Sequence, residues 1–214
     1  MKNILRNALF FALITLFYQC SEVELKESKK RISQNKNKVY MDIPKNKQTE
    51  SYRKLKAKIE GLIGLSSLET LVNAEEIRVW FANSSLQEQL VILKKEKGEW
   101  QASIHTLRFN YDSLTNDLIS IDKDVQIRVP KSGWKLFTDS LSTLKIDSLP
   151  DMSLINNYEL GFDGRTITVE IAKMNVYRIY SYWEPNFNKD ISKEAKQILL
   201  ILALLENELN FKVL

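Results

Sequence analysis

Three residue types are scarce in this chain of 214 residues, which contains one cysteine, one histidine and six glycines. Zinc sites and Ser-His-Asp triads generally need histidine, and zinc sites usually need several histidines or cysteines, so the lone His105 argues against both. A single histidine in a strand-like stretch is more typical of a packed or surface residue than of a catalytic one. With so few glycines, the chain offers no glycine-rich loop for phosphate and nothing similar to a P-loop or Rossmann fingerprint.

The N-terminus has the layout of a secretory signal. Lys2 and Arg6 accompany a nearly continuous apolar run at residues 7–18, and Cys20 follows this run after one polar residue. An apolar run of about 7–15 residues is typical of a signal and too short to span a bilayer as a mature helix. The alternative is an uncleaved N-terminal membrane anchor in which Cys20 has no role.

Residues 17–20, Phe-Tyr-Gln-Cys, resemble a loose form of the bacterial lipobox that is common in the Bacteroidetes. The resemblance implies a signal peptide at residues 1–19 and an acylated Cys20, which leaves no thiol for a disulfide, a metal or nucleophilic catalysis. Each buried CH₂ of an acyl chain contributes about 0.8 kcal/mol, so a triacylated cysteine would anchor the protein firmly. Glu22 and Glu24 are similar to the acidic segments that direct lipoproteins of that phylum to the cell surface. We therefore expect a lipid-anchored protein of the cell envelope, in the outer membrane on its periplasmic face or cell surface.

The segment after the lipobox is predicted to be a tether. Residues 20–48 are rich in lysine, asparagine, serine and glutamate and have few large apolar side chains, so they cannot bury enough surface to offset ordering. Removal of residues 1–19 takes away Lys2 and Arg6 and lowers the formal net charge from +4 to +2. This near-neutral balance argues against a nucleic-acid partner. Residues 49–214 are then expected to form a single domain.

Hydrophobic periodicity predicts an α+β fold for this domain. The strand-like segments form a meander and a hairpin, in an antiparallel sheet of about six to seven strands packed by two to three helices on one face. Asp163 and Gly164 favour a type I′ turn between two strands. Residues 198–205 are apolar on nearly every side, which predicts a central buried helix. We expect helices near residues 49–63, 133–146 and 192–207, and strands near residues 77–81, 90–94, 100–109, 125–129, 158–162, 165–172 and 176–183.

The C-terminal half resembles a pattern in uncharacterised bacterial proteins. In that pattern a tryptophan-containing helix precedes Asp-Gly, a strand glutamate, a tyrosine and Trp-x-Pro before a leucine-rich helix. The resemblance covers roughly residues 133–205 and implies a fold rather than an activity. The matching positions are Trp134, Asp163, Gly164, Glu170, Tyr177, Trp183 and Pro185.

Glu170, Tyr177 and Tyr182 are the candidate ligand or partner contacts. If the apolar residues on either side of Glu170 face the core, its carboxylate lies on an open face of the sheet, close to the aromatic stretch that follows. The alternative is a solvated glutamate or one paired with Arg165 or Arg178. Alternation sends Tyr177 and Tyr182 to opposite faces, and one of the two aromatic sets could form an exposed contact patch.

No catalytic constellation is evident, and we expect neither a cofactor nor a metal. The acidic residues between Asp112 and Asp124 lack the D-x-D-x-D-G spacing of a calcium loop. The leading hypothesis is a non-catalytic binding module with an unknown protein or glycan partner, held at the membrane by the lipid on Cys20. The alternatives are a carboxylate-dependent hydrolase that uses Glu170 with nearby Asp residues, and an immunity-type inhibitor protein.

Overall fold

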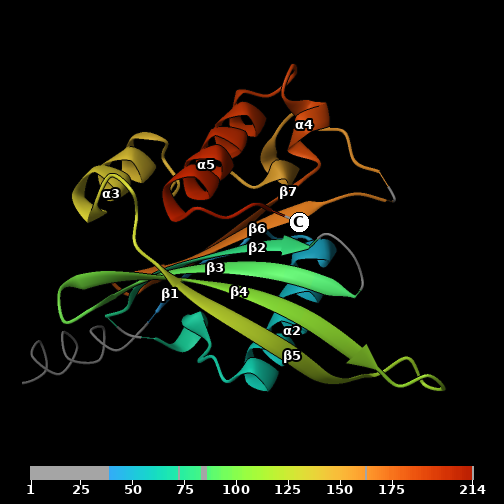
Figure 1. Ribbon diagram of the computed structural model, residues 1–214. Helices are drawn as coiled ribbons and strands as arrows, with labels where there is room; N and C mark the ends of the chain where they lie inside the picture. Colours follow the sequence, from blue (N-terminus) through green and yellow to red (C-terminus); the bar gives the residue numbers. More distant parts are fainter. Residues whose placement is uncertain (1–38, 72, 83–85, 162, 214) are drawn as a thin grey trace, which may run out of the picture. The chain divides into compact units, whose positions relative to one another are not determined.

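The computed structural model describes residues 39–71, 73–82, 86–161 and 163–213. The predicted signal peptide, Cys20 and most of the predicted tether lie outside these ranges. Within them the α+β prediction is confirmed: one seven-stranded sheet is packed by helices on both faces (Figure 1). The strands are β1 (Tyr40–Asp42), β2 (Glu75–Ala82), β3 (Gln87–Glu96), β4 (Glu99–Tyr111), β5 (Leu118–Arg128), β6 (Thr166–Lys173) and β7 (Val176–Trp183).

The sheet is an open one with the strand order β1-β7-β6-β2-β3-β4-β5. Every neighbouring pair is antiparallel except β1 and β7, which run parallel. The predicted meander corresponds to β2, β3, β4 and β5, and β5 begins several residues earlier than the sequence pattern indicated. One edge of the sheet is thus formed by the short β1 and the other by β5.

Helices cover both faces of the sheet rather than the single face that was predicted. Figure 1 shows α3 (Trp134–Thr143), α4 (Pro185–Asn188) and α5 (Lys193–Leu209) on one side and α2 (Lys47–Ile63) on the other. The main apolar core lies on the α3 and α5 side, where Val79, Val91 and Val169 meet the helices. The α2 side has two smaller apolar clusters, one around Ile59 and Trp80 and one around Tyr177 and Ile179. The physical reason for the missed layer is that the buried side of α2 includes the charged residues Lys56 and Glu60.

The prediction that residues 198–205 form a central buried helix is wrong. Helix α5 lies on the surface of its layer: Ile198, Ile201 and Leu205 are buried against the sheet, whereas Leu200 is 57% exposed. Because the solvent-facing positions of this helix are also apolar, the sequence pattern indicated burial on every side, although the helix is buried on one side only. The helix begins where predicted, with the Ser192 side chain accepting from the backbone N–H of Ala195.

The predicted hairpin on either side of Asp163 and Gly164 is also absent. Residues 158–161 form no strand, because the backbone of Glu159 pairs with the buried side chain of Asn188 through bonds of 2.8 and 3.1 Å. Strand β6 pairs instead with β2 and β7. The β6–β7 hairpin turns at Met174 and Asn175, whose positive φ angles of 47° and 64° are those that a type I′ turn needs.

The folded unit includes residues that the sequence assigned to the tether. Strand β1 pairs with β7, and α2 begins at Lys47, where the Asn46 side chain caps it by accepting from the backbone N–H of Thr49 at 2.7 Å. The short β1 carries no alternating pattern that a sequence window could detect. The compact unit therefore begins at Val39.

Candidate functional site

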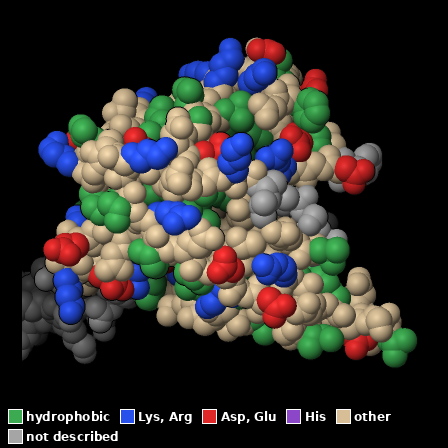
Figure 2. Space-filling view, in the orientation of Figure 1, with side chains coloured by type: hydrophobic (Ala, Val, Ile, Leu, Met, Phe, Trp, Pro, Cys, Tyr) green, Lys and Arg blue, Asp and Glu red, His purple; other side chains and the backbone are tan. Residues whose placement is uncertain are grey.

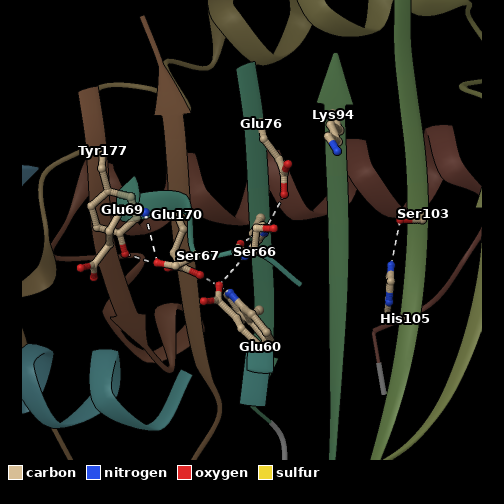
Figure 3. A network of polar contacts seen from close by, with 12 residues as sticks. Glu60, Ser66, Ser67, Glu69, Glu76, Lys94, Ser103, His105, Glu170 and Tyr177 are labelled. Atoms are coloured by element: carbon tan, nitrogen blue, oxygen red, sulfur yellow. Dashed lines mark hydrogen bonds and ion pairs between the residues drawn. The ribbon is translucent and has the colours of Figure 1, made fainter. Parts of the chain in front are cut away.

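A layer of buried charge separates α2 from the sheet. The carboxylates of Glu60, Glu76, Glu88 and Glu170 and the cations of Lys56 and Arg78 are each at most 6% exposed. Charged side chains are almost never fully buried unless they are paired. This layer is the chemically most unusual part of the described chain (Figure 3).

Arg78 on β2 organises the centre of the layer. Its Nε donates to Glu76 at 2.7 Å, its Nη1 forms an ion pair with Glu60 of α2, and its Nη2 donates to the carbonyl of Ser66 at 2.9 Å. The guanidinium thus joins the sheet to α2 and to the segment that follows it. Because every nitrogen of the side chain already has a partner, Arg78 is a structural cation rather than a free ligand-binding one.

Lys56 of α2 forms a second buried ion pair, with Glu88 of β3. Its ammonium also lies 4.4 Å from the ring centre of Trp80 and 4.7 Å from that of Tyr52, which are cation–π distances. Burial lowers the pKa of Lys56, and the Glu88 carboxylate opposes that effect. This pair anchors the middle of α2 to the sheet.

Glu170 lies in the same layer and forms no ion pair with a cation of the described residues. Its two carboxylate oxygens accept from Trp80 Nε1 at 2.5 Å and from the Tyr177 hydroxyl at 2.7 Å. Burial, followed by the nearby Glu170 carboxylate, raises the pKa of Tyr177 well above its ordinary value, so the phenol keeps the proton that it donates. The expected open face is therefore covered, and Glu170 is a buried acceptor.

The structure brings together two of the three candidate contact residues. Tyr177 and Glu170 meet under α2, whereas Tyr182 lies on the opposite face, packs in the main core and donates to the carbonyl of Pro150 at 2.7 Å. Tyr177, Tyr180 and Tyr182 of β7 are all buried, so neither Tyr177 nor Tyr182 belongs to an exposed aromatic patch. Neither Arg165 nor Arg178 forms an ion pair with Glu170 among the described residues.

The layer holds four carboxylates and only two cations. An unpaired buried charge costs on the order of several kcal/mol in a medium of low polarity. An excess of buried carboxylates over cations is therefore relieved when a carboxylate takes up a proton. Burial raises the pKa of Glu60 from 4.5 to about 7, with Glu170 adding to the shift and Arg78 opposing it. Glu60 is thus the group at which the excess charge is expected to titrate.

A groove of about 430 Å³ opens on this face of the sheet beyond the end of α2. Its floor carries Arg78, Ser103 and His105, and its outer wall is formed by Val125 and Ile127 of β5. Figure 3 shows Ser103 and His105 on one strand, across the sheet from Glu76 and Lys94. Glu170 does not line the groove.

His105 is the groove residue with the most unusual environment. It is 6% exposed, its Nε2 lies 2.9 Å from the Ser103 hydroxyl oxygen, and its buried Nδ1 has no hydrogen-bond partner in the part of the chain that the structure describes. Burial, followed by the charges of Lys123 and Arg78, lowers the pKa of His105 to about 4, so the ring is neutral near pH 7.

The tautomer of His105 decides whether Ser103 is activated. A buried N–H without an acceptor is more costly than a buried bare ring nitrogen, which favours the proton on Nε2 and donation to Ser103. General-base activation needs the reverse, with Nε2 accepting from the serine and a third group orienting Nδ1. The pair therefore provides fixed polar groups for binding rather than an activated nucleophile.

Sequence reasoning missed Lys56, Glu60 and Arg78. The apolar periodicity of α2 combines two buried residues, Ile59 and Ile63, with two that are 46% and 44% exposed, Leu55 and Leu62, and it passes over the buried charges between them. The usable signal was the i, i+4 spacing of Lys56 and Glu60 together with the alternation of Glu76, Arg78 and Trp80, a charged helix stripe facing a charged strand stripe. Nothing in the sequence alone says that two such stripes face each other.

Comparisons with known proteins assign no family to this fold and site. No protein-family model, curated protein or solved structure matches the chain. Within the described ranges, no cluster of three or more His, Cys, Asp or Glu side chains is arranged to hold a metal ion. None of the helices in those ranges has the length and hydrophobicity that a bilayer crossing requires.

Proposed function

We propose that this protein is a lipid-anchored, non-catalytic binding module of the cell envelope, and that its ligand contacts the groove beside β5. The observation that supports binding is the groove itself, which combines a fixed polar floor with an apolar outer wall. Ligand sites are typically concave and largely apolar, with a few well-placed polar groups. The neutral His105, and Arg78 with a protein partner at each of its nitrogens, favour an uncharged polar ligand, such as a glycan or a peptide backbone, over a phosphate.

The charge on the surface is consistent with such a role. Figure 2 shows Lys and Arg interspersed with Asp and Glu over the visible face, without a large region of one sign. On this face, the distribution favours neither a nucleic-acid partner nor strong electrostatic attraction to a membrane surface. Attachment to the membrane is therefore assigned to the lipid on Cys20, supported by the basic start and short apolar run before it.

Substitution of Cys20 tests the anchor. We expect the full chain to incorporate palmitate, to be processed in a globomycin-sensitive manner and to sediment with membranes, and we expect Cys20→Ala to lose all three properties. A matched Ser21→Ala variant should retain them. Palmitate labelling that survives Cys20→Ala would contradict the proposed anchor.

The groove is tested with a variant that fills it. Ser103 lies half-buried on the groove floor, so Ser103→Arg places a long side chain where a ligand would sit. An envelope glycan or peptidoglycan peptide present at 100 times its Kd should stabilise the native chain by about 2.7 kcal/mol, measured as a shift of thermal unfolding. We expect Ser103→Arg to abolish this shift and the exposed control Ser148→Arg to keep it. Two results would contradict binding at the groove. One is a shift of thermal unfolding that survives Ser103→Arg, and the other is the absence of a shift with every envelope glycan and peptidoglycan peptide used.

A further inference from the structure

The two edges of the sheet are treated differently by the chain. Strand β1 covers the outer side of β7, whereas β5 pairs with β4 on one side and has no neighbour on the other within the described residues. A bare edge presents a row of unpaired N–H and C=O groups, and natural proteins usually shorten, cover or block it. Strand β5 spans Leu118–Arg128, and none of its residues is proline.

Alternation along β5 gives the edge two distinct faces. On the α2 side, Val125 and Ile127 are 41% and 70% exposed and form the outer wall of the groove. On the opposite side lie the charged residues Asp122, Asp124 and Arg128. Among the described residues no ion pair involves any of these three. Asp122 accepts from Asn110, Asp124 accepts from Gln126, and Arg128 donates to Gln126.

We propose that β5 pairs antiparallel with β5 of a second copy of this chain, about a two-fold axis through Val125. The charges on the strand select this register. A two-fold axis that relates two antiparallel strands of one sheet is perpendicular to the sheet, and residues directly opposite one another lie on the same face. The axis must therefore pass between one residue and the same residue of the other copy. With Val125 opposite Val125, Asp122 lies opposite Arg128 on both sides of the axis, and Asp124 lies opposite Gln126.

Neighbouring registers are less favourable. An axis through Lys123 sets Lys123 against itself and Asp122 against Asp124, and an axis through Asp124 sets that carboxylate against itself. Like charges directly opposite one another destabilise a strand pair, whereas opposite charges stabilise it. An axis through Gln126 pairs Asp124 with Arg128 but leaves only residues 124–128 in the ladder. The Val125 register keeps residues 122–128 paired, and it is therefore the longest one with attractive charges.

This pairing has a consequence for the groove. Because the axis is perpendicular to the sheet, α2 of both copies lies on the same face, Val125 of one copy adjoins Val125 of the other, and Ile127 lies opposite Lys123. The exposed apolar walls of the two grooves then meet along the β5–β5 pair, and the two grooves lie side by side on one face of a continuous sheet. The inference goes beyond the proposed function, because it depends on neither the lipid anchor nor a ligand in the groove.

Cross-linking of the full chain in membranes tests the register. Cys20 is the only native cysteine, so Val125→Cys introduces one thiol that the pairing places within about 4.5–5.5 Å of its copy, measured between Cβ atoms. Oxidation or a short bis-maleimide should give a covalent dimer at Val125→Cys, with a yield about tenfold above that of Ile119→Cys. The control residue lies on the same strand, is exposed, and stands outside the proposed ladder. Equal yields at the two positions, or a higher yield at Gln126→Cys than at Val125→Cys, would overturn the register.

Charge reversal tests the pairing itself. In the Val125→Cys background, Asp122→Arg and Arg128→Asp each create two like-charge pairs and should reduce the dimer yield about tenfold. The double variant restores opposite charges and should recover most of the yield. We expect unchanged thermal unfolding in these variants, because Asp122 is exposed and neither residue forms an ion pair within the described part of the chain. Unchanged unfolding would show that the lower dimer yield is not caused by misfolding. Single variants without effect, or a double variant that stays monomeric, would overturn the proposal.

Discussion

Replacing Arg78 with methionine is expected to lower the free energy of unfolding by about 3 to 5 kcal/mol. Methionine keeps an apolar stem of similar length, so the loss reports the missing cation rather than a cavity. Glu60 and Glu76 then stay buried without their positive partner, and the carbonyl of Ser66 loses its donor. Breaking one side of a buried ion pair is costly because the other side remains desolvated.

The measurement is urea unfolding, with a less buried ion pair as the control. Arg53 pairs with Glu69 at 2.7 Å, and both side chains are about a quarter to a third exposed. Arg53→Met should therefore cost no more than about 1 kcal/mol. Adding Glu60→Gln to Arg78→Met removes one stranded charge and should recover on the order of 1–2 kcal/mol. Equal losses for Arg78→Met and Arg53→Met would show that the buried layer does not hold α2 to the sheet.

The parts of the fold that the sequence predicts are those with a one-sided apolar pattern. Strand β2 alternates Ile77, Val79 and Phe81 with polar or aromatic residues, and α3 places Phe137 and Leu141 on one face, so both elements lie where periodicity puts them. The turn at Met174 and Asn175 was missed because methionine is an unusual residue at a positive φ. Asp163-Gly164 has the composition that a type I′ turn favours, but the side chain of Asn188 binds the backbone of Glu159, so the segment before the turn forms no strand.

The candidate site shows a different limit of sequence reasoning. Glu170 and Tyr177 were singled out, and they do meet, but only because β6 and β7 are neighbours in register. Their burial depends on α2, whose charged stripe has the sequence of a solvent-facing helix surface. Burial of charge is a pairwise property: Lys56 is tolerable inside only because Glu88 is opposite it. A one-dimensional hydrophobicity pattern contains no information about such partners.

Titration of Glu60 and His105 is expected to give the chain an unusual dependence of stability on pH. Burial raises the pKa of Glu60 to about 7, so its stabilising contribution is fully present below pH 4.5 and is lost as the pH rises to 7. Burial lowers the pKa of His105 to about 4, so its contribution is present above pH 6.5 and is lost as the pH falls towards 4. After allowance for solvent screening, each contribution amounts to about 2 kcal/mol.

These two contributions oppose one another between pH 4.5 and 6.5, which makes single substitutions informative. We expect Glu60→Gln to unmask the histidine, so that the free energy of unfolding rises by about 2 kcal/mol from pH 4 to 6.5 relative to the native chain. We expect His105→Gln to unmask the glutamate, so that it falls by about the same amount from pH 4.5 to 7. Both are measured by urea unfolding at a series of pH values, with the exposed Glu50→Gln as the control. Parallel profiles for the native chain and both variants would mean that the excess carboxylate charge under α2 is neutralised elsewhere than at Glu60.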